Sequence, residues 1–296
     1  MAKPILFDPV TSPYLVDGDF KIKKAPTSPP DDAPTKEDNK EALEKQVAKL
    51  CKLQERLYAD HRYALLLVFQ AMDAGGKDGT IRAVLSGVNP AGCEVYAFKQ
   101  PSHEELDHDF LWRVNRALPE RGRIGVFNRS HYEEVLVVRV HPEYLVGERL
   151  PKQPKDLSEL WEQRYESIVD AEKHWARNGL VILKFFLHVS KKEQHERILE
   201  RIEEKDHNWK FEAGDWKESA RWDDYQEAYQ DALRATSKPW APWYAIPADS
   251  KPFMRRTVAE IIVDTVSQLD LEYPKVTDED RAIMAKVRKE LVAEKE

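Results

Sequence analysis

A glycine-rich loop directly follows a short apolar segment, and this pairing constrains the fold more than any other feature of the chain. Residues 64–69 read Ala-Leu-Leu-Leu-Val-Phe, which is typical of a strand buried on both faces of a parallel sheet. The loop reads Asp73-Ala-Gly-Gly-Lys-Asp-Gly-Thr80 and leads into a segment expected to be helical. A strand, a glycine loop with a lysine and a helix together indicate a site where backbone N–H groups hold phosphate.

Apolar strands and amphipathic helices alternate through the rest of the chain. Helices are expected from residue 36 to about Asp60 and over 102–118, 132–140, 156–178, 190–205 and 252–269, and strands over 94–98, 124–127, 180–187 and 243–246. Strands that alternate with helices favour an α/β fold with a parallel sheet covered on both faces.

Three regions are distinguished by composition. Residues 1–35 hold seven of the 18 prolines and little apolar periodicity, so we interpret them as a Pro-rich N-terminal arm. Residues 36–270 form the phosphate-binding domain, and residues 271–296 form a charged C-terminal tail. The first residues lack the uninterrupted apolar core of a signal peptide, and the apolar runs are too short to span a bilayer. We therefore expect a cytoplasmic protein with no membrane partner.

One stretch departs from the alternation. Residues 207–229 mix aromatic and basic side chains without the continuous apolar face of a core helix. They predict either a surface helical hairpin or a lid whose cations reach over a bound anion. The lid, at about residues 200–230, is favoured because of the glycine loop.

Charge and cysteine content exclude some classes of partner. The formal net charge is −7, which argues against electrostatic binding of nucleic acid. Two cysteines are too few for a zinc site. Five arginines between Trp112 and Arg129, against the single acid Glu120, form either an anion-facing strip or solvated surface.

The glycine loop is a variant of the P-loop pattern G-x-x-x-x-G-K-[ST]. Ala71 stands at the first glycine position, and Asp78 stands where a Ser or Thr would follow the lysine. Magnesium would therefore be held by carboxylate or water, with Asp73 and Asp78 as the candidate ligands and Thr80 as a weaker one. Lys77 would supply a mobile cation, and glycines would let the backbone approach the anion. These glycines are Gly75, Gly76 and Gly79.

A second motif, Phe127-Asn-Arg-Ser-His-Tyr-Glu133, follows the third expected strand. Asn128 occupies the place where a P-loop enzyme usually presents an acid. Arg129 would face the same crevice and bind phosphate oxygens; the alternative is a salt bridge at the strand end. We assign no chemistry to His131, and a metal site at His103 and His108 is not expected.

Together these motifs resemble the polyphosphate kinase 2 family. The resemblance rests on the two motifs, on Trp209-Lys-Phe211 and on Arg221-Trp222, and runs from about Leu53 to Leu269. It implies a thymidylate-kinase-like P-loop fold with a helical lid. It also implies phosphoryl transfer between inorganic polyphosphate and nucleotides with Mg²⁺, or with Mn²⁺ in its place, in a homo-oligomer such as a dimer or tetramer.

The second motif also resembles one branch of that family. Asn128 with His131, Glu133 and Glu134 is similar to class III, which accepts both nucleoside monophosphates and diphosphates. The resemblance therefore implies conversion of AMP to ADP and of ADP to ATP.

Roles for individual side chains follow from the needs of phosphoryl transfer, which are mainly positioning and neutralisation of charge. We expect Asp73 to orient the acceptor phosphate or its magnesium, Lys77 and Arg129 to hold oxygens of the transferred group, and Asn128 to position without ionising. Further residues are expected to contact phosphate or nucleotide. They are Glu133 and, on and beside the lid, Arg197, Arg201, Lys210 and Arg221.

Two other functions remain open on the residues alone. An ATP-dependent nucleoside monophosphate kinase would share the P-loop, the lid and the acceptor site. A phosphate-binding regulatory module without turnover would also carry a glycine loop. The departures from the P-loop pattern and the amide at Asn128 are compatible with this second alternative.

Overall fold

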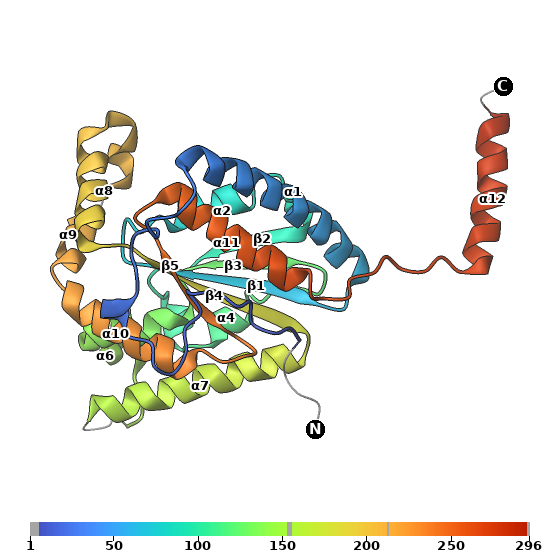
Figure 1. Cartoon of the computed structure of the whole chain (residues 1–296). Helices are drawn as coiled ribbons and strands as arrows, with labels where there is room; N and C mark the ends of the chain where they lie inside the picture. The colour runs from blue at the N-terminus through green and yellow to red at the C-terminus, as the bar shows by residue number, and fades with distance from the viewer. Residues whose placement is uncertain (1–5, 153–155, 212, 295–296) are drawn as a thin grey trace.

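The structure is a computed structural model that describes residues 6–152, 156–211 and 213–294. Five parallel strands form one sheet in the order β2-β3-β1-β4-β5 (Figure 1). The strands are β1 (Ala64–Gln70), β2 (Cys93–Ala97), β3 (Ile124–Asn128), β4 (Leu180–His188) and β5 (Trp243–Pro247). The expected α/β fold with a parallel sheet is confirmed.

Helices cover both faces of the sheet (Figure 1). The α-helices are α1 (Lys36–Asp60), α2 (Lys77–Val84), α3 (His103–Leu106), α4 (Trp112–Asn115), α5 (Val137–Val140), α6 (Leu145–Glu148), α7 (Leu157–Arg177), α8 (Lys191–Glu203), α9 (Ala213–Ser219), α10 (Trp222–Thr236), α11 (Lys251–Val266) and α12 (Asp278–Ala293). Short 3-10 helices are η1 (Ile22–Lys24), η2 (Pro90–Gly92), η3 (His131–Val135), η4 (Pro142–Tyr144) and η5 (Lys205–Lys210). Helices α1, α2 and α11 lie on one face, and α7 and α10 lie on the other.

The two central strands explain why the site forms at one edge of the sheet. Every residue of β1 and β4 is buried, as their continuous apolar runs predict. The register pairs Phe69 of β1 with Asn128 of β3. The glycine loop and the second motif therefore leave the sheet side by side at its carboxyl edge, the usual place for ligands in an open α/β sheet.

The N-terminal arm packs along β5. Val16 donates its backbone N–H to Trp243 at 2.9 Å, and Ala245 donates to Tyr14 at 2.8 Å. The side chains of Phe7 and Val16 are buried against the core. The arm thus pairs with the edge of β5, which would otherwise be open to another chain.

Two long helices expected from the sequence are wrong. Residues 102–118 hold only the four-residue helices α3 and α4, and residues 132–140 hold η3 followed by α5. Local side-chain bonds to the backbone form within the first stretch and at the start of the second. Asp109 accepts the N–H of Leu111 at 2.9 Å, and Ser130 accepts the N–H of Tyr132 at 3.2 Å; such bonds compete with helix formation.

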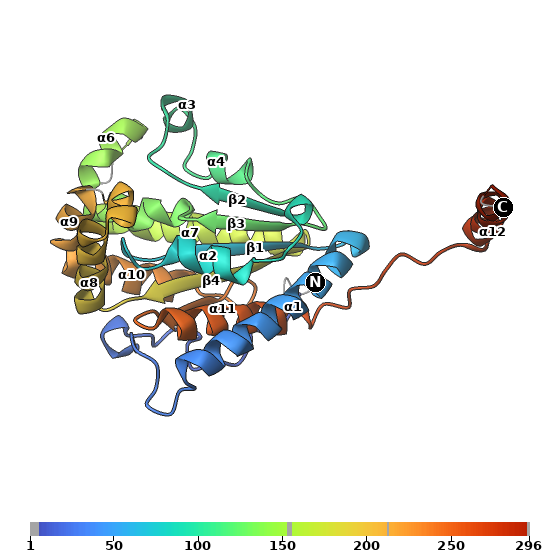
Figure 2. The same cartoon turned by 90° about the horizontal axis from the view of Figure 1, so that it is seen from above.

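The expected lid divides into two parts. Residues 205–211 and 213–219, which we call the lid segment, comprise η5 and α9 and lie with α8 at one end of the molecule (Figure 2). Trp209 and Trp216 in this segment are 78% and 57% exposed. Helix α10, in contrast, is part of the core. The prediction that residues 207–229 lack the apolar face of a core helix is therefore wrong for α10. Its buried stripe continues past residue 229 through Ala232 and Leu233.

The C-terminal tail forms a helix that stands apart from the sheet. Helix α12 follows an extended stretch and has no buried residue (Figures 1 and 2). Among the helices that the structure describes, none is both long and apolar enough to cross a membrane.

Candidate active site

The glycine loop has a backbone that other residues could not adopt easily. At Gly75 a Cβ would lie 2.6 Å from the Cβ of Ala71 and 2.8 Å from the carbonyl oxygen of Met72. Gly76 precedes α2 with φ 96°, a left-handed conformation that favours glycine. Ala74 is also left-handed, with φ 58°. Gly79 lies in the first turn of α2, where a Cβ would meet the Arg255 guanidinium at 2.9 Å.

An arginine of helix α8 forms a hydrogen bond with the backbone of the glycine loop. Arg197, predicted as a phosphate contact, is buried there and donates to the carbonyl of Ala74 at 3.2 Å and to that of Ala248 at 2.6 Å. Its Nε donates to Glu193 at 2.7 Å. In this structure Arg197 therefore supports the loop backbone and does not face an open surface.

Lys77 is buried, so the expectation of a mobile loop cation is wrong. It is the first residue of α2, only 8% exposed, and its Nζ donates to the carbonyl of Ala71 at 2.9 Å. Burial, together with the positive charge of the nearby Arg129, lowers the pKa of Lys77 to about 8. Asp73, Glu133 and Asp78 act in the opposite direction. Lys77 thus lies in the same electrostatic cluster as the other predicted catalytic groups.

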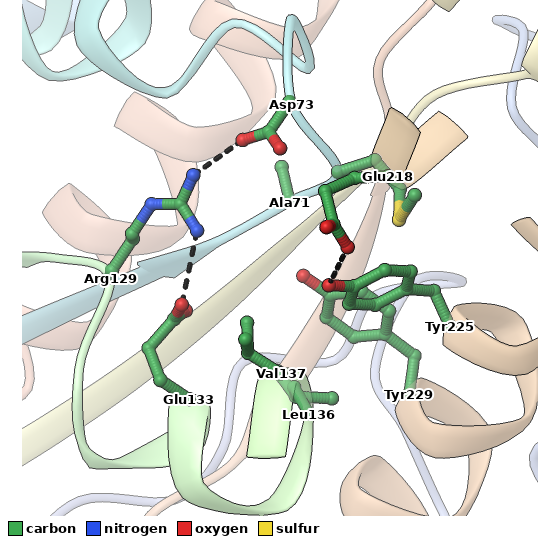
Figure 3. Close-up of a pocket in the computed structure, with 10 residues that line it drawn as sticks. Ala71, Asp73, Arg129, Glu133, Leu136, Val137, Glu218, Tyr225 and Tyr229 are labelled. Carbon is green, nitrogen blue, oxygen red and sulfur yellow. Dashed lines mark hydrogen bonds and ion pairs between the residues drawn. The ribbon is translucent and has the colours of Figure 1, made fainter. Parts of the chain in front are cut away.

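Arg129 lies between two carboxylates. Its guanidinium pairs with Asp73 of the glycine loop and, at 3.0 Å, with Glu133 (Figure 3). Gln70 at the end of β1 donates to the other oxygen of Glu133 at 2.9 Å. The neighbouring Glu133 raises the pKa of Arg129. The alternative of a strand-end salt bridge is confirmed, and the same side chain, 35% exposed, still lines a pocket.

Asn128 links the two motifs. Its Nδ2 donates to the Asp78 carboxylate at 2.5 Å, across from the end of β3 to the start of α2. A carboxylate at position 128 would lie beside the Asp78 carboxylate, and the two negative charges would repel each other. The amide therefore connects β3 to α2 without adding a second negative charge.

A small pocket lies between these groups and α10 (Figure 3). Its volume is about 20 Å³, enough for one water molecule. Asp73, Arg129 and Glu133 line one side. Tyr225 and Tyr229 of α10 line the other, together with Glu218 of the lid segment. The pocket is far smaller than the sites that hold small-molecule ligands.

Sequence reasoning missed the far wall of this pocket. Tyr225 donates to Glu218 at 2.6 Å, and Glu218 also contacts Nε2 of His141 at 2.8 Å. Burial raises the pKa of Tyr225 and Tyr229, so both remain protonated. The available signal was the spacing of the two tyrosines, four residues apart on a helix, which places them on one face.

Other predicted residues lie away from the cluster. The Thr80 hydroxyl is buried and donates to the Gly76 carbonyl at 2.9 Å, as expected of a residue that closes a helical turn. Arg221 pairs with Asp224 at 2.5 Å at the start of α10. Arg201 is half-buried in the last turn of α8. The side chain of Lys210 lies outside the described residues.

The five arginines between Trp112 and Arg129 do not form one strip. Arg113 is buried and donates to the carbonyl of Lys99 at 2.8 Å. Arg123 pairs with Glu94 at 2.7 Å on the surface of β2. Within the described part of the chain, Arg129 is the member of the five that lines the pocket.

A buried ionic network supports the second motif. Lys184, the one charged residue of β4 apart from its terminal histidine, donates to Glu172 at 2.6 Å and to the Tyr132 hydroxyl at 2.8 Å. Tyr132 donates in turn to Glu172 at 2.9 Å. Nε2 of His131 lies 3.5 Å from Glu172, and burial lowers the pKa of His131, which stays neutral. His131 thus belongs to the core, in agreement with assigning it no chemistry.

Comparison with known proteins places this arrangement in a family. The family model described as polyphosphate kinase 2 matches residues 33–274. An ADP-polyphosphate phosphotransferase of Rhodopseudomonas palustris is 52% identical over 258 residues, which cover 87% of this chain and 89% of that protein. An AMP/ADP-polyphosphate phosphotransferase of Meiothermus ruber is 45% identical over 263 residues, with 88% and 93% covered.

A solved structure agrees with this assignment. The crystal structure of polyphosphate kinase 2 from Arthrobacter aurescens superposes with a TM-score of 0.85 and 36% identity, over 95% of this chain and 98% of that one. The match includes the P-loop kinase-like sheet on which the site described above is built. The chain therefore belongs to the polyphosphate kinase 2 family.

Proposed function

We propose that this protein transfers the terminal phosphoryl group of inorganic polyphosphate to AMP and ADP, giving ADP and ATP. The observation that carries the proposal is the convergence of Lys77 and Arg129 with the carboxylates of Asp73, Asp78 and Glu133 at one sheet edge. In a member of the polyphosphate kinase 2 family, these two cations are the groups that suit a transferring phosphoryl group. The names of the relatives support polyphosphate as donor and adenine nucleotides as acceptors.

The chain's own residues would act by positioning and charge. Lys77 and Arg129 would bind oxygens of the transferred group, because both cations lie at the carboxyl edge between the glycine loop and β3. The start of α2 would add backbone N–H groups. Asp73 would orient the acceptor through its contact with Arg129, and Asn128 would hold Asp78 in place. No covalent intermediate on the protein is required.

We also propose that Mg²⁺ is the cofactor, with Mn²⁺ as a substitute, held by Asp73 and Asp78. The donor set fits, because Mg²⁺ commonly takes one or two carboxylates and completes its shell with water and substrate phosphates. Among the described residues no group of three or more acidic, histidine or cysteine side chains is placed to hold a metal ion. Bound Mg²⁺ would neutralise charge on the phosphate oxygens.

The remaining expectations about setting stay proposals. We propose a homo-oligomer, a dimer or a tetramer, that works in the cytoplasm without nucleic acid or membrane partners. The net charge of −7 supports the absence of a nucleic-acid partner.

The acceptor range is the part of the proposal that most needs a test, because the two relatives differ in their names. With polyphosphate and Mg²⁺ but no ATP, AMP should give ADP first and ATP later, and ADP should give ATP. Separation of the nucleotides over a time course measures both. Product from ADP alone would contradict the use of AMP, and absence of any turnover would favour the phosphate-binding module.

Asn128 offers a test of how AMP is accepted. Asn128→Asp should lower kcat/KM for AMP about tenfold more than for ADP. An acid there would oppose Asp78 and would repel a monophosphate, which carries about two negative charges near pH 7, whereas ADP has a second phosphate to bind the loop. Steady-state kinetics with both acceptors at saturating polyphosphate measures the ratio. Asn178→Asp, at the end of α7, is the matched control. Equal losses with AMP and ADP would show general positioning only.

A further inference from the structure

Gln194 of α8 lies buried between the glycine loop and the lid segment. Its side chain has no exposed surface. Its Nε2 donates to the carbonyl of Asp73 at 3.0 Å, and its Oε1 accepts from the Ser219 hydroxyl at 2.9 Å. The amide nitrogen therefore binds the glycine loop, and the amide oxygen binds α9. The side chain of Gln194 therefore connects the glycine loop directly to the lid segment.

At the glycine loop, Gln194 binds the backbone next to a residue in a strained conformation. Asp73 precedes Ala74, whose φ of 58° is costly for a residue with a Cβ. Gln194 holds the carbonyl of Asp73, and Arg197, one turn later on α8, holds the carbonyl of Ala74. The direction of the Asp73 side chain towards Arg129 depends on the position of its backbone. Loss of the Gln194 bond would remove a hydrogen bond from the partly buried Asp73 carbonyl and let the loop relax.

The lid end of the connection moves with the wall of the pocket. Ser219 is the last residue of α9 and is 2% exposed, and its hydroxyl oxygen also lies 2.9 Å from Nε2 of His195. The preceding residue, Glu218, lines the pocket and contacts Tyr225 and His141. A shift of α9 that opens the pocket would therefore also break the contact of Ser219 with Gln194.

We propose that Gln194 is a positioning residue that couples the seating of α9 to the orientation of Asp73. When α9 is seated, Ser219 fixes the amide of Gln194, and the amide fixes the Asp73 carbonyl. When α9 moves away, the amide is free to turn and Asp73 loses its alignment with Arg129. The reaction would then proceed only with the lid segment in place, which limits transfer of the phosphoryl group to water. The inference deepens the proposed function and rests on it for its kinetic readout.

The test is a double-mutant cycle on Gln194→Met and Ser219→Ala. Methionine keeps the length of the side chain without its hydrogen bonds. Each variant should lower kcat about tenfold, with KM for polyphosphate within twofold of its original value, because Lys77 and Arg129 remain in place. The double variant should also lose about tenfold, since both changes break one connection. Gln163→Met, an exposed glutamine on α7, is the control and should leave kcat unchanged.

Additive losses, about a hundredfold in the double variant, would overturn the coupling, as would a KM that rises in proportion to the loss of kcat. If Gln194→Met does not fold, Ser219→Ala alone decides: an unchanged kcat overturns the proposal, and a tenfold loss at constant KM supports it.

A second readout does not depend on turnover. Amide hydrogen exchange is followed in residues 71–80 and in 214–219, with and without tripolyphosphate and Mg²⁺. In the unmodified protein the anion should protect both segments, whereas in Gln194→Met it should protect the loop only. Protection of both segments in Gln194→Met would overturn the coupling. If the unmodified protein shows coupled protection but no nucleotide product, the proposed function fails and the coupling stands.

Discussion

Replacing Lys77 with methionine should lower kcat/KM for nucleotide phosphorylation about a thousandfold while leaving the melting temperature within about 3 °C. The loss in rate is that expected when a preorganised charge contact to the reacting group is removed. Stability should hold because Lys77 is a buried cation whose burial lowers its pKa to about 8. A methionine of similar length removes the desolvation penalty of the charge and keeps the packing.

Lys52→Met on α1 is the matched control, since Lys52 is exposed and far along the chain from the loop. It should leave both quantities unchanged. Steady-state kinetics and thermal melts on the three proteins make the comparison. Equal and modest losses of rate in the two variants would remove Lys77 from the site, and a large fall in melting temperature for Lys77→Met would assign it to structure instead.

Replacing Lys184 with methionine should lower the free energy of unfolding by about 3–5 kcal/mol. Lys184 and Glu172 are both fully buried, and their charged groups are 2.6 Å apart. Removal of the lysine leaves the Glu172 carboxylate buried without its cation, and an uncompensated buried charge is strongly destabilising. Urea denaturation monitored by tryptophan fluorescence measures the change.

A second variant distinguishes loss of the Lys184–Glu172 ion pair from burial of a single unpaired charge. Lys184→Met combined with Glu172→Leu should recover most of the stability, because both charges are then gone. Lys45→Met, which breaks an exposed pair with Glu41, should leave the free energy of unfolding unchanged. A double variant less stable than Lys184→Met alone would contradict the account of this network.

Local sequence pattern was enough to predict the sheet and the edge at which the two motifs meet. The continuous apolar runs of β1 and β4 are long enough to define strands buried on both faces. A glycine loop after one such strand and a polar motif after a neighbouring strand must meet at the carboxyl edge of a parallel sheet. Arg129 and Asp73 meet at that edge.

Burial and hydrogen-bond partners were not predictable in the same way, because they depend on which distant segments pack together. Arg197 looks like any surface arginine in the sequence, yet it is held against carbonyls from two different loops. The buried face of α10 was not recognised in the sequence because it is formed by tyrosines and the small residue Ala228 rather than by large aliphatic side chains. Lys184 did carry a signal: a single lysine inside an apolar strand buried on both faces requires a buried acid as partner.

The most direct test of the account is the source of the transferred group. The protein is incubated with AMP, Mg²⁺ and ³²P-labelled polyphosphate, without ATP, and the label in each nucleotide is followed over time. The account predicts label in ADP first and in ATP later, at rates that fall about a thousandfold in Lys77→Met. Absence of label from both nucleotides, with ADP formed only after ATP is added as donor, would contradict it and identify an ATP-dependent monophosphate kinase.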